Sequence, residues 1–141
     1  MIHVSSVPYE HVAQVWPMVK GYLSAAVVRQ KLYSLEAVLD RVLKREVALW
    51  VVLDDEVDEP IAVATTRIVE YPERRGLAID WIGGVRMSEW LADLHEMMER
   101  YARDMGCSHI EGAGREGWVK ALAPFGYKRS MPTYHKELTD G

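Results

Sequence analysis

The sequence has little cysteine and no long hydrophobic run. Its single cysteine, Cys107, cannot form a disulfide within the chain and excludes a structural zinc site held by several cysteines. The longest apolar run covers residues 47–53, far short of the ~20 residues that a transmembrane helix needs. The N-terminus also lacks the basic and then apolar pattern of a secretion signal. These absences predict a cytoplasmic protein without a membrane partner.

The sequence also lacks an excess of positive charge. Seventeen Lys and Arg residues face 21 Asp and Glu residues, which gives a formal net charge of −4. A field of this sign repels polyanions, so we expect no nucleic-acid partner. The length of 141 residues and the hydrophobic share of 49% are typical of one globular unit, and we expect a single domain over residues 1–141.

Metal-ligand spacing is absent as well. The five histidines are spread along the chain without the i, i+4 spacing or the cysteine partners of a metal centre. We therefore predict no metal site. These histidines are His3, His11, His95, His109 and His135.

Hydrophobic periodicity, on the other hand, is clear and predicts a mixed α+β chain. Predicted strands cover residues 2–7, 47–53, 61–69, 77–82, 107–111 and 127–138. Predicted helices cover the stretch after Pro8, which Pro17 should kink or divide, then the segments 34–45, 88–106 and 116–123. Ser34 and Ser88 are suitable N-caps, and Gly106 is a suitable helix end. Short turn-rich connections favour antiparallel pairing of the three middle strands.

Three glycines near the C-terminus spell a G-x-G-x-x-G pattern at Gly112, Gly114 and Gly117. This pattern is typical of dinucleotide binding at the first turn of a parallel sheet. Only 24 residues follow Gly117 here, and Pro124 ends the helix too early for a crossover, so we reject that interpretation. A weaker interpretation remains, in which backbone amides at the helix start and Arg115 hold an anion.

Two short motifs and the order of the elements resemble the GNAT N-acetyltransferase superfamily. Ala102 is followed four residues later by Gly106, and the sequence Phe125, Gly126, Tyr127 is similar to the family's ending after its last helix. The resemblance implies an α+β fold with a mixed, mostly antiparallel sheet of 6–7 strands, flanked by about four helices. It also implies acetyl-CoA as co-substrate and direct attack of an amine on the thioester.

The resemblance assigns coenzyme A binding to the fourth strand and the loop that follows it. The residues concerned are Ile82, Gly83, Gly84, Val85 and Arg86. Arg86 begins the family's pyrophosphate motif, but Glu89 and Leu91 stand where that motif has small residues. Side chains there obstruct the backbone amides, and a carboxylate repels phosphate. In the alternative register, the two glycines upstream supply the flexible turn.

For the chemistry, the resemblance indicates two carboxylates at the point where the fourth and fifth strands separate. Asp80 and Glu111 are the candidate catalytic bases. The alternative for Asp80 is a structural ion pair with an arginine such as Arg86 or Arg115. Leu122 stands where many family members carry the tyrosine that protonates the leaving thiolate.

Two functions follow from this interpretation. The first is a GNAT-like N-acyltransferase that transfers an acetyl group from acetyl-CoA to a small-molecule or protein amine. The second is a catalytically inactive GNAT-fold binding or structural protein, virus-encoded or assembly-associated, that no longer binds coenzyme A. Such a protein would act through a protein partner or as a homo-oligomer.

Overall fold

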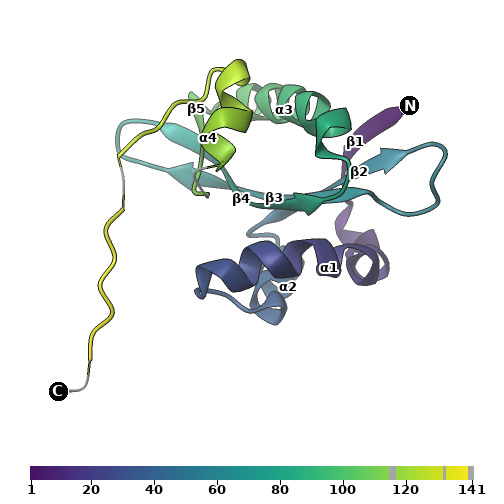
Figure 1. The fold of residues 1–141 in the computed structure, drawn as a ribbon, viewed down its shortest axis with the longest axis horizontal. Helices are drawn as coiled ribbons and strands as arrows, with labels where there is room; N and C mark the ends of the chain where they lie inside the picture. The colour runs from purple at the N-terminus through teal and green to yellow at the C-terminus, as the bar shows by residue number, and fades with distance from the viewer. Residues whose placement is uncertain (115–116, 132, 140–141) are drawn as a thin grey trace.

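The computed structural model describes residues 1–114, 117–131 and 133–139, which form a five-stranded sheet with helices on both faces (Figure 1). The strands follow one another across the sheet in chain order. The first four are antiparallel neighbours, whereas the fifth runs parallel to the fourth. The strands are β1 (Ile2–Ser6), β2 (Ala48–Asp54), β3 (Ala62–Glu70), β4 (Arg75–Gly84) and β5 (His109–Gly112).

Four α-helices accompany this sheet in the described residues. They are α1 (Val12–Gln30), α2 (Leu35–Leu43), α3 (Met87–Asp104) and α4 (Gly117–Leu122), with short 3-10 turns η1 (Tyr9–His11) and η2 (Ala123–Phe125). Helices α1 and α2 cover one face of the sheet and α3 covers the other (Figure 1). The predicted α+β class, the antiparallel meander and the four helices are therefore confirmed. No helix of the described residues is long and apolar enough to cross a membrane.

The core has two layers because the strands alternate their side chains between the two faces. On the α1–α2 face, Leu23 and Val38 pack with Trp81 of β4. On the α3 face, Trp90 and Met98 pack with strand residues that include Leu77. Burial of each such side chain stabilises the fold by about 1.5–3 kcal/mol. The two layers fix the sheet between the helices and so hold the separation of β4 and β5 in place.

The N-terminal helices differ from the prediction in one respect. Helix α1 continues through Pro17 to Gln30 and is not divided there. Its end is set by Lys31, which adopts the left-handed conformation with φ of 58°. Ser34 then caps α2 as predicted, because its hydroxyl oxygen accepts a hydrogen bond from the Ala37 amide at 3.1 Å.

The predicted Ser88 cap of α3 is wrong. Arg86 occupies the N-cap position, with φ of 62° and ψ of 39°, and no side chain caps the helix. The chain must turn sharply between the end of β4 and α3, and the left-handed backbone of Arg86 makes that turn. The other end agrees with the prediction, since Gly106 follows α3 with φ of 76°.

The predicted count of 6–7 strands is also wrong. The described part of the segment 127–139 forms no strand, so the sheet has five strands in the described residues. The turn η2 ends at Gly126, whose φ is 90°, and Tyr127 then packs against His95 of α3. Residues 133–139 thus lie away from the sheet and do not run beside β5 (Figure 1).

Candidate functional site

The candidate site lies where β4 and β5 separate. Strand β5 pairs with β4 only from Gly76 to Ile79, opposite His109 to Gly112. Strand β4 continues to Gly84 without β5 beside it. The register with β3 shifts between Thr65 and Thr66, so Asp80 is an extra residue that bulges out of β4 at the point of separation.

The last part of β4 has backbone groups that face this gap. The amide of Val85 donates to the carbonyl of Ile61 on the β3 side. Because successive residues of a strand direct their backbone groups to opposite sides, Ile82 and Gly84 direct theirs away from β3. We call this part of the strand, from Asp80 to Gly84, the open edge of β4. It can form backbone hydrogen bonds with an extended ligand, as the prediction for Ile82 and Gly84 requires.

Gly83 and Gly84 also have a packing role. A side-chain carbon at Gly83 would lie 2.1 Å from the carbonyl oxygen of Tyr22 in α1. One at Gly84 would lie 2.5 Å from Ala62, and Gly84 has φ of 151°. Both positions therefore need glycine for the close approach of neighbouring backbone, whether or not a ligand binds.

Arg86 is engaged by two carboxylates of this chain. Its guanidinium donates two hydrogen bonds to Glu89, at 2.6 and 2.8 Å, and one to Asp54 at 2.7 Å. Asp54 lies at the end of β2 and its side chain is only 8% exposed. The residue predicted to bind the pyrophosphate is thus held at the start of α3 by two internal carboxylates, Glu89 and Asp54. The sequence predicted that a carboxylate at position 89 would oppose phosphate binding, and the structure shows that this carboxylate is bonded to Arg86.

The charges in this cluster reinforce one another. The hydrogen bonds that Arg86 donates to Glu89 and Asp54 raise the pKa of Arg86, so the guanidinium stays protonated. The bond from Arg86 lowers the pKa of Glu89. The backbone amide of Glu56, and then Arg86, lower the pKa of Asp54. The N-terminal ammonium of Met1 also lies 3.8 Å from Asp54, so the two carboxylates face two positive charges at neutral pH.

Asp80 and Glu111, the two candidate bases, lie on the same face of the sheet. Alternation places Arg67 on the α1–α2 face, two residues beyond Thr65 and four beyond Val63 of the core on that side. Asp80 accepts a hydrogen bond from Arg67 Nε at 2.8 Å. The predicted alternative for Asp80, an arginine ion pair, is therefore found, but the partner is Arg67. Arg86 has other partners, and Arg115 lies outside the described residues.

Of the two candidate bases, Glu111 has contacts that hold its carboxylate in place without an arginine partner. The hydroxyl of Tyr71 donates to its carboxylate at 2.8 and 2.9 Å, and Nε2 of His109 lies 2.9 Å from it. Partial burial opposes ionisation of Glu111, but the bonds from His109 and Tyr71 outweigh it and lower the pKa. The carboxylate is therefore ionised at neutral pH and able to accept a proton. The hydrogen bond between Tyr71 and Glu111 also raises the pKa of the Tyr71 hydroxyl.

Sequence reasoning missed three members of this group, which we call the polar cluster: Arg67, Tyr71 and His109. The cluster also contains Asp80 and Glu111. The signal for His109 and Glu111 was present, because residues two apart on a strand share a face. Arg67 and Tyr71 lie on and after another strand, so only the register of β3 and β4 could reveal them.

Two of the three glycines in the pattern near the C-terminus, Gly112 and Gly114, have a packing explanation, whereas nothing lies within 4 Å of a side-chain carbon at Gly117. A side-chain carbon at Gly114 would lie 2.8 Å from the Trp118 ring, and one at Gly112 would lie 3.1 Å from the carbonyl of Ile79. Helix α4 has only six residues. Arg115 lies outside the described residues, so the anion-binding interpretation gains no support from the structure.

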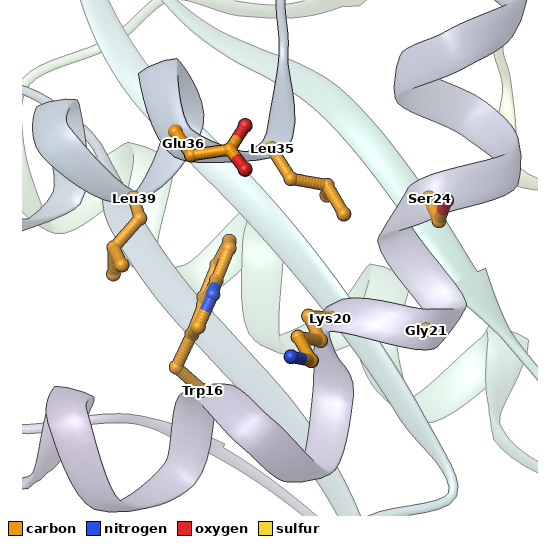
Figure 2. Close-up of a pocket in the computed structure, with 7 residues that line it drawn as sticks. All are labelled: Trp16, Lys20, Gly21, Ser24, Leu35, Glu36 and Leu39. Carbon is orange, nitrogen blue, oxygen red and sulfur yellow. The ribbon is translucent and has the colours of Figure 1, made fainter.

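Other features of the surface do not add chemistry to the site. A hollow of about 350 Å³ lies between α1 and α2, where Figure 2 shows the Trp16 ring extending from α1 toward α2. Leu35 and Leu39 also line it, together with the polar residues Lys20, Ser24 and Glu36. Within the part of the chain that the structure describes, no hydrogen bond or ion pair joins these three polar side chains into a catalytic group. Among the described residues, no three His, Cys, Asp or Glu side chains come together to hold a metal ion.

Comparison with solved structures finds the same arrangement in acetyltransferases. A probable acetyltransferase has a TM-score of 0.74 over 99% of both chains at 14% identity. Glucosamine-6-phosphate N-acetyltransferase from Arabidopsis thaliana has a TM-score of 0.66 over 99% of both chains at 12% identity. An aminoglycoside N-acetyltransferase in complex with CoA has a TM-score of 0.69 over 98% of this chain and 95% of that chain, at 13% identity.

Neither a protein-family model nor a curated protein matches the sequence. The structural likenesses nevertheless extend over nearly the whole chain. The chain therefore has the fold of the GNAT N-acetyltransferases, as the sequence predicted.

Proposed function

We propose that the protein is an N-acyltransferase that transfers an acetyl group from acetyl-CoA to an amine. The observation that supports this most is the open edge of β4 beside the polar cluster. The edge offers backbone groups of Ile82 and Gly84 to an extended arm, and the cluster offers an ionised carboxylate at Glu111. A similar fold has been solved with CoA, and two of the similar structures are named for amine substrates.

The residues of the chain have distinct roles in this proposal. Backbone amides at the open edge polarise the thioester carbonyl. The amine nitrogen attacks the carbonyl carbon, the C–N bond forms and the C–S bond breaks. The proton lost by nitrogen passes to Glu111, and the thiolate takes up a proton from solvent. Glu111 thus acts as general base, with Tyr71 and His109 as positioning residues.

A second function is favoured by one observation, the engagement of Arg86 by Glu89 and Asp54. In this alternative the carboxylate of Glu89 closes the pyrophosphate position, and the fold serves as a binding module that does not use coenzyme A. The two functions differ in a measurable property, which is whether acetyl-CoA binds and is consumed.

Release of free coenzyme A thiol tests the first function. Purified protein with saturating acetyl-CoA and a broad amine panel is expected to release thiol above the rate without protein. Glu111→Gln keeps the size of the side chain and removes the base, so we expect kcat to fall at least ~100-fold.

The matched control is Glu96→Gln, an exposed carboxylate paired with Arg100 on α3. This variant should keep the wild-type rate. Thiol release that is equal to the blank for every amine, from protein whose circular dichroism shows the folded state, would refute the proposal. Equal rates in Glu111→Gln and wild type would assign the base elsewhere.

A further inference from the structure

The guanidinium of Arg67 is only partly engaged by its neighbours in the polar cluster. Its Nε donates to Asp80, and its side chain is 36% exposed. Among the described residues, no hydrogen bond or ion pair engages its two terminal nitrogens. The end of a guanidinium with two parallel N–H donors fits a carboxylate in a bidentate manner. Arg67 is therefore able to bind an external carboxylate while it keeps its bond to Asp80.

Two carboxylates lie beside the same guanidinium. Arg67 on β3 and Glu111 on β5 both lie opposite Ala78 of β4, so their side chains are on the same face of the sheet. The bond to Asp80 and then the negative charge of Glu111 raise the pKa of Arg67. Asp80 is bonded through one oxygen, so its other oxygen is left to accept a hydrogen bond. Two negative charges against one positive charge leave this place with a net charge of −1, which attracts an ammonium group.

Buried polar atoms nearby also lack partners. The hydroxyl of Thr65 and the indole nitrogen of Trp81 are buried and make no hydrogen bond within the described residues. The two residues face each other across β3 and β4, immediately before the bulge at Asp80. The ring of Tyr33 meets Trp81 edge-on with centroids 5.2 Å apart. Thr65 and Trp81 are 0% and 3% exposed, so these atoms lie beneath the surface of the polar cluster and do not reach an external ligand.

The charges discriminate between classes of acidic ligand. A phosphate ester has nearly two negative charges, and one guanidinium beside two carboxylates does not offset them. A carboxylate has one negative charge and matches the free end of Arg67. An ammonium on the same molecule matches Asp80 and Glu111. The arrangement is therefore complementary to a small zwitterion.

We propose that the amine substrate is a free amino acid, held by its carboxylate on Arg67 and by its amine between Asp80 and Glu111. This inference rests on the proposed function, because the ammonium between the carboxylates, once it has lost one proton to solvent, is the amine that would be acetylated. It narrows the substrate from amines in general to amines that also have a carboxylate.

Calorimetric titration of the twenty common amino acids into the full chain tests the binding site without acetyl-CoA. The best ligand is then compared with its methyl ester, which lacks the carboxylate, and with its N-acetyl form, which lacks the ammonium. We expect the free amino acid to bind at least ~10-fold more tightly than either, which is the size of one good charged contact.

Arg67→Lys keeps the charge and removes the bidentate end. We expect it to bind the amino acid at least ~10-fold more weakly and to bind the methyl ester as wild type does. Arg103→Lys is the matched control, since Arg103 is an exposed residue on α3 that pairs with Glu99, and it should bind as wild type does. Thermal unfolding of each variant shows whether the fold is kept.

Acetyl transfer is measured with the same ligands, so that the two proposals fail separately. Transfer to methyl esters as fast as to free amino acids, unchanged in Arg67→Lys, would overturn the substrate class and leave the acyltransferase proposal intact. Binding of amino acids without any binding of acetyl-CoA would keep the zwitterion site and refute the acyltransferase. No binding of any amino acid, by itself or with acetyl-CoA, would overturn this inference.

Discussion

At the scale of single residues, glycine positions show how the sequence serves the architecture of the site. Gly83 lies under α1, and a side-chain carbon there would lie 2.1 Å from the backbone oxygen of Tyr22. Backbone cannot yield as a flexible side chain does. We expect Gly83→Ala to lower the free energy of unfolding by ~3 kcal/mol or more, as overpacking does in a tight core.

Gly21 provides the matched control for this prediction. It lies in α1, and nothing lies within 4 Å of an added side-chain carbon. Gly21→Ala should raise the free energy of unfolding by ~0.5–1 kcal/mol, since alanine favours the helix. Urea unfolding followed by circular dichroism measures both variants. Equal stabilities of the two would show that the approach of α1 to β4 is not as close as described.

At the scale of secondary-structure elements, the start of α2 depends on one hydroxyl. The Ser34 oxygen accepts the Ala37 amide, and Ser34 has an extended backbone as an N-cap should. Ser34→Ala is expected to cost ~1 kcal/mol in unfolding free energy, while Ser34→Asp keeps an acceptor and should retain most of it. Ser24→Ala, within α1, is the control that should change stability little. If Ser34→Asp and Ser24→Ala lowered the free energy of unfolding as much as Ser34→Ala does, the capping role would be contradicted.

The elements also show how much the sequence could predict. Helix α3 and strands β2 to β4 were predicted because their apolar periodicity is set by local spacing, which one sequence contains. The strand over residues 127–138 was wrong, since a strand needs a partner edge and the turn at Gly126 directs the chain elsewhere. Asp80 and Glu111 could be singled out from the sequence as carboxylates on two consecutive strands, but their partners Arg67 and Tyr71 depend on cross-strand register.

At the scale of the whole molecule, several carboxylates link stability to pH. Asp54, Glu89, Glu99 and Glu111 have pKa values below 3.8 for Asp and 4.5 for Glu. The folded state thus binds protons less readily than the unfolded chain, so the stability they contribute is present above pH 4.5 and is lost as pH falls through the folded pKa values. We expect the urea midpoint to fall steadily at pH values below ~4. A midpoint that rises on acidification would contradict these pairings.

At the same scale, we propose that acetyl-CoA binds along the open edge of β4, beside a carboxylate that would weaken the pyrophosphate contact. Calorimetric titration of acetyl-CoA into wild type, Glu89→Gln and Arg86→Ala tests it most directly. We expect wild type to bind, Glu89→Gln to bind ~10-fold more tightly because one like charge is removed, and Arg86→Ala to bind more weakly. No heat from folded wild type and none from Glu89→Gln would contradict the claim and favour the binding module.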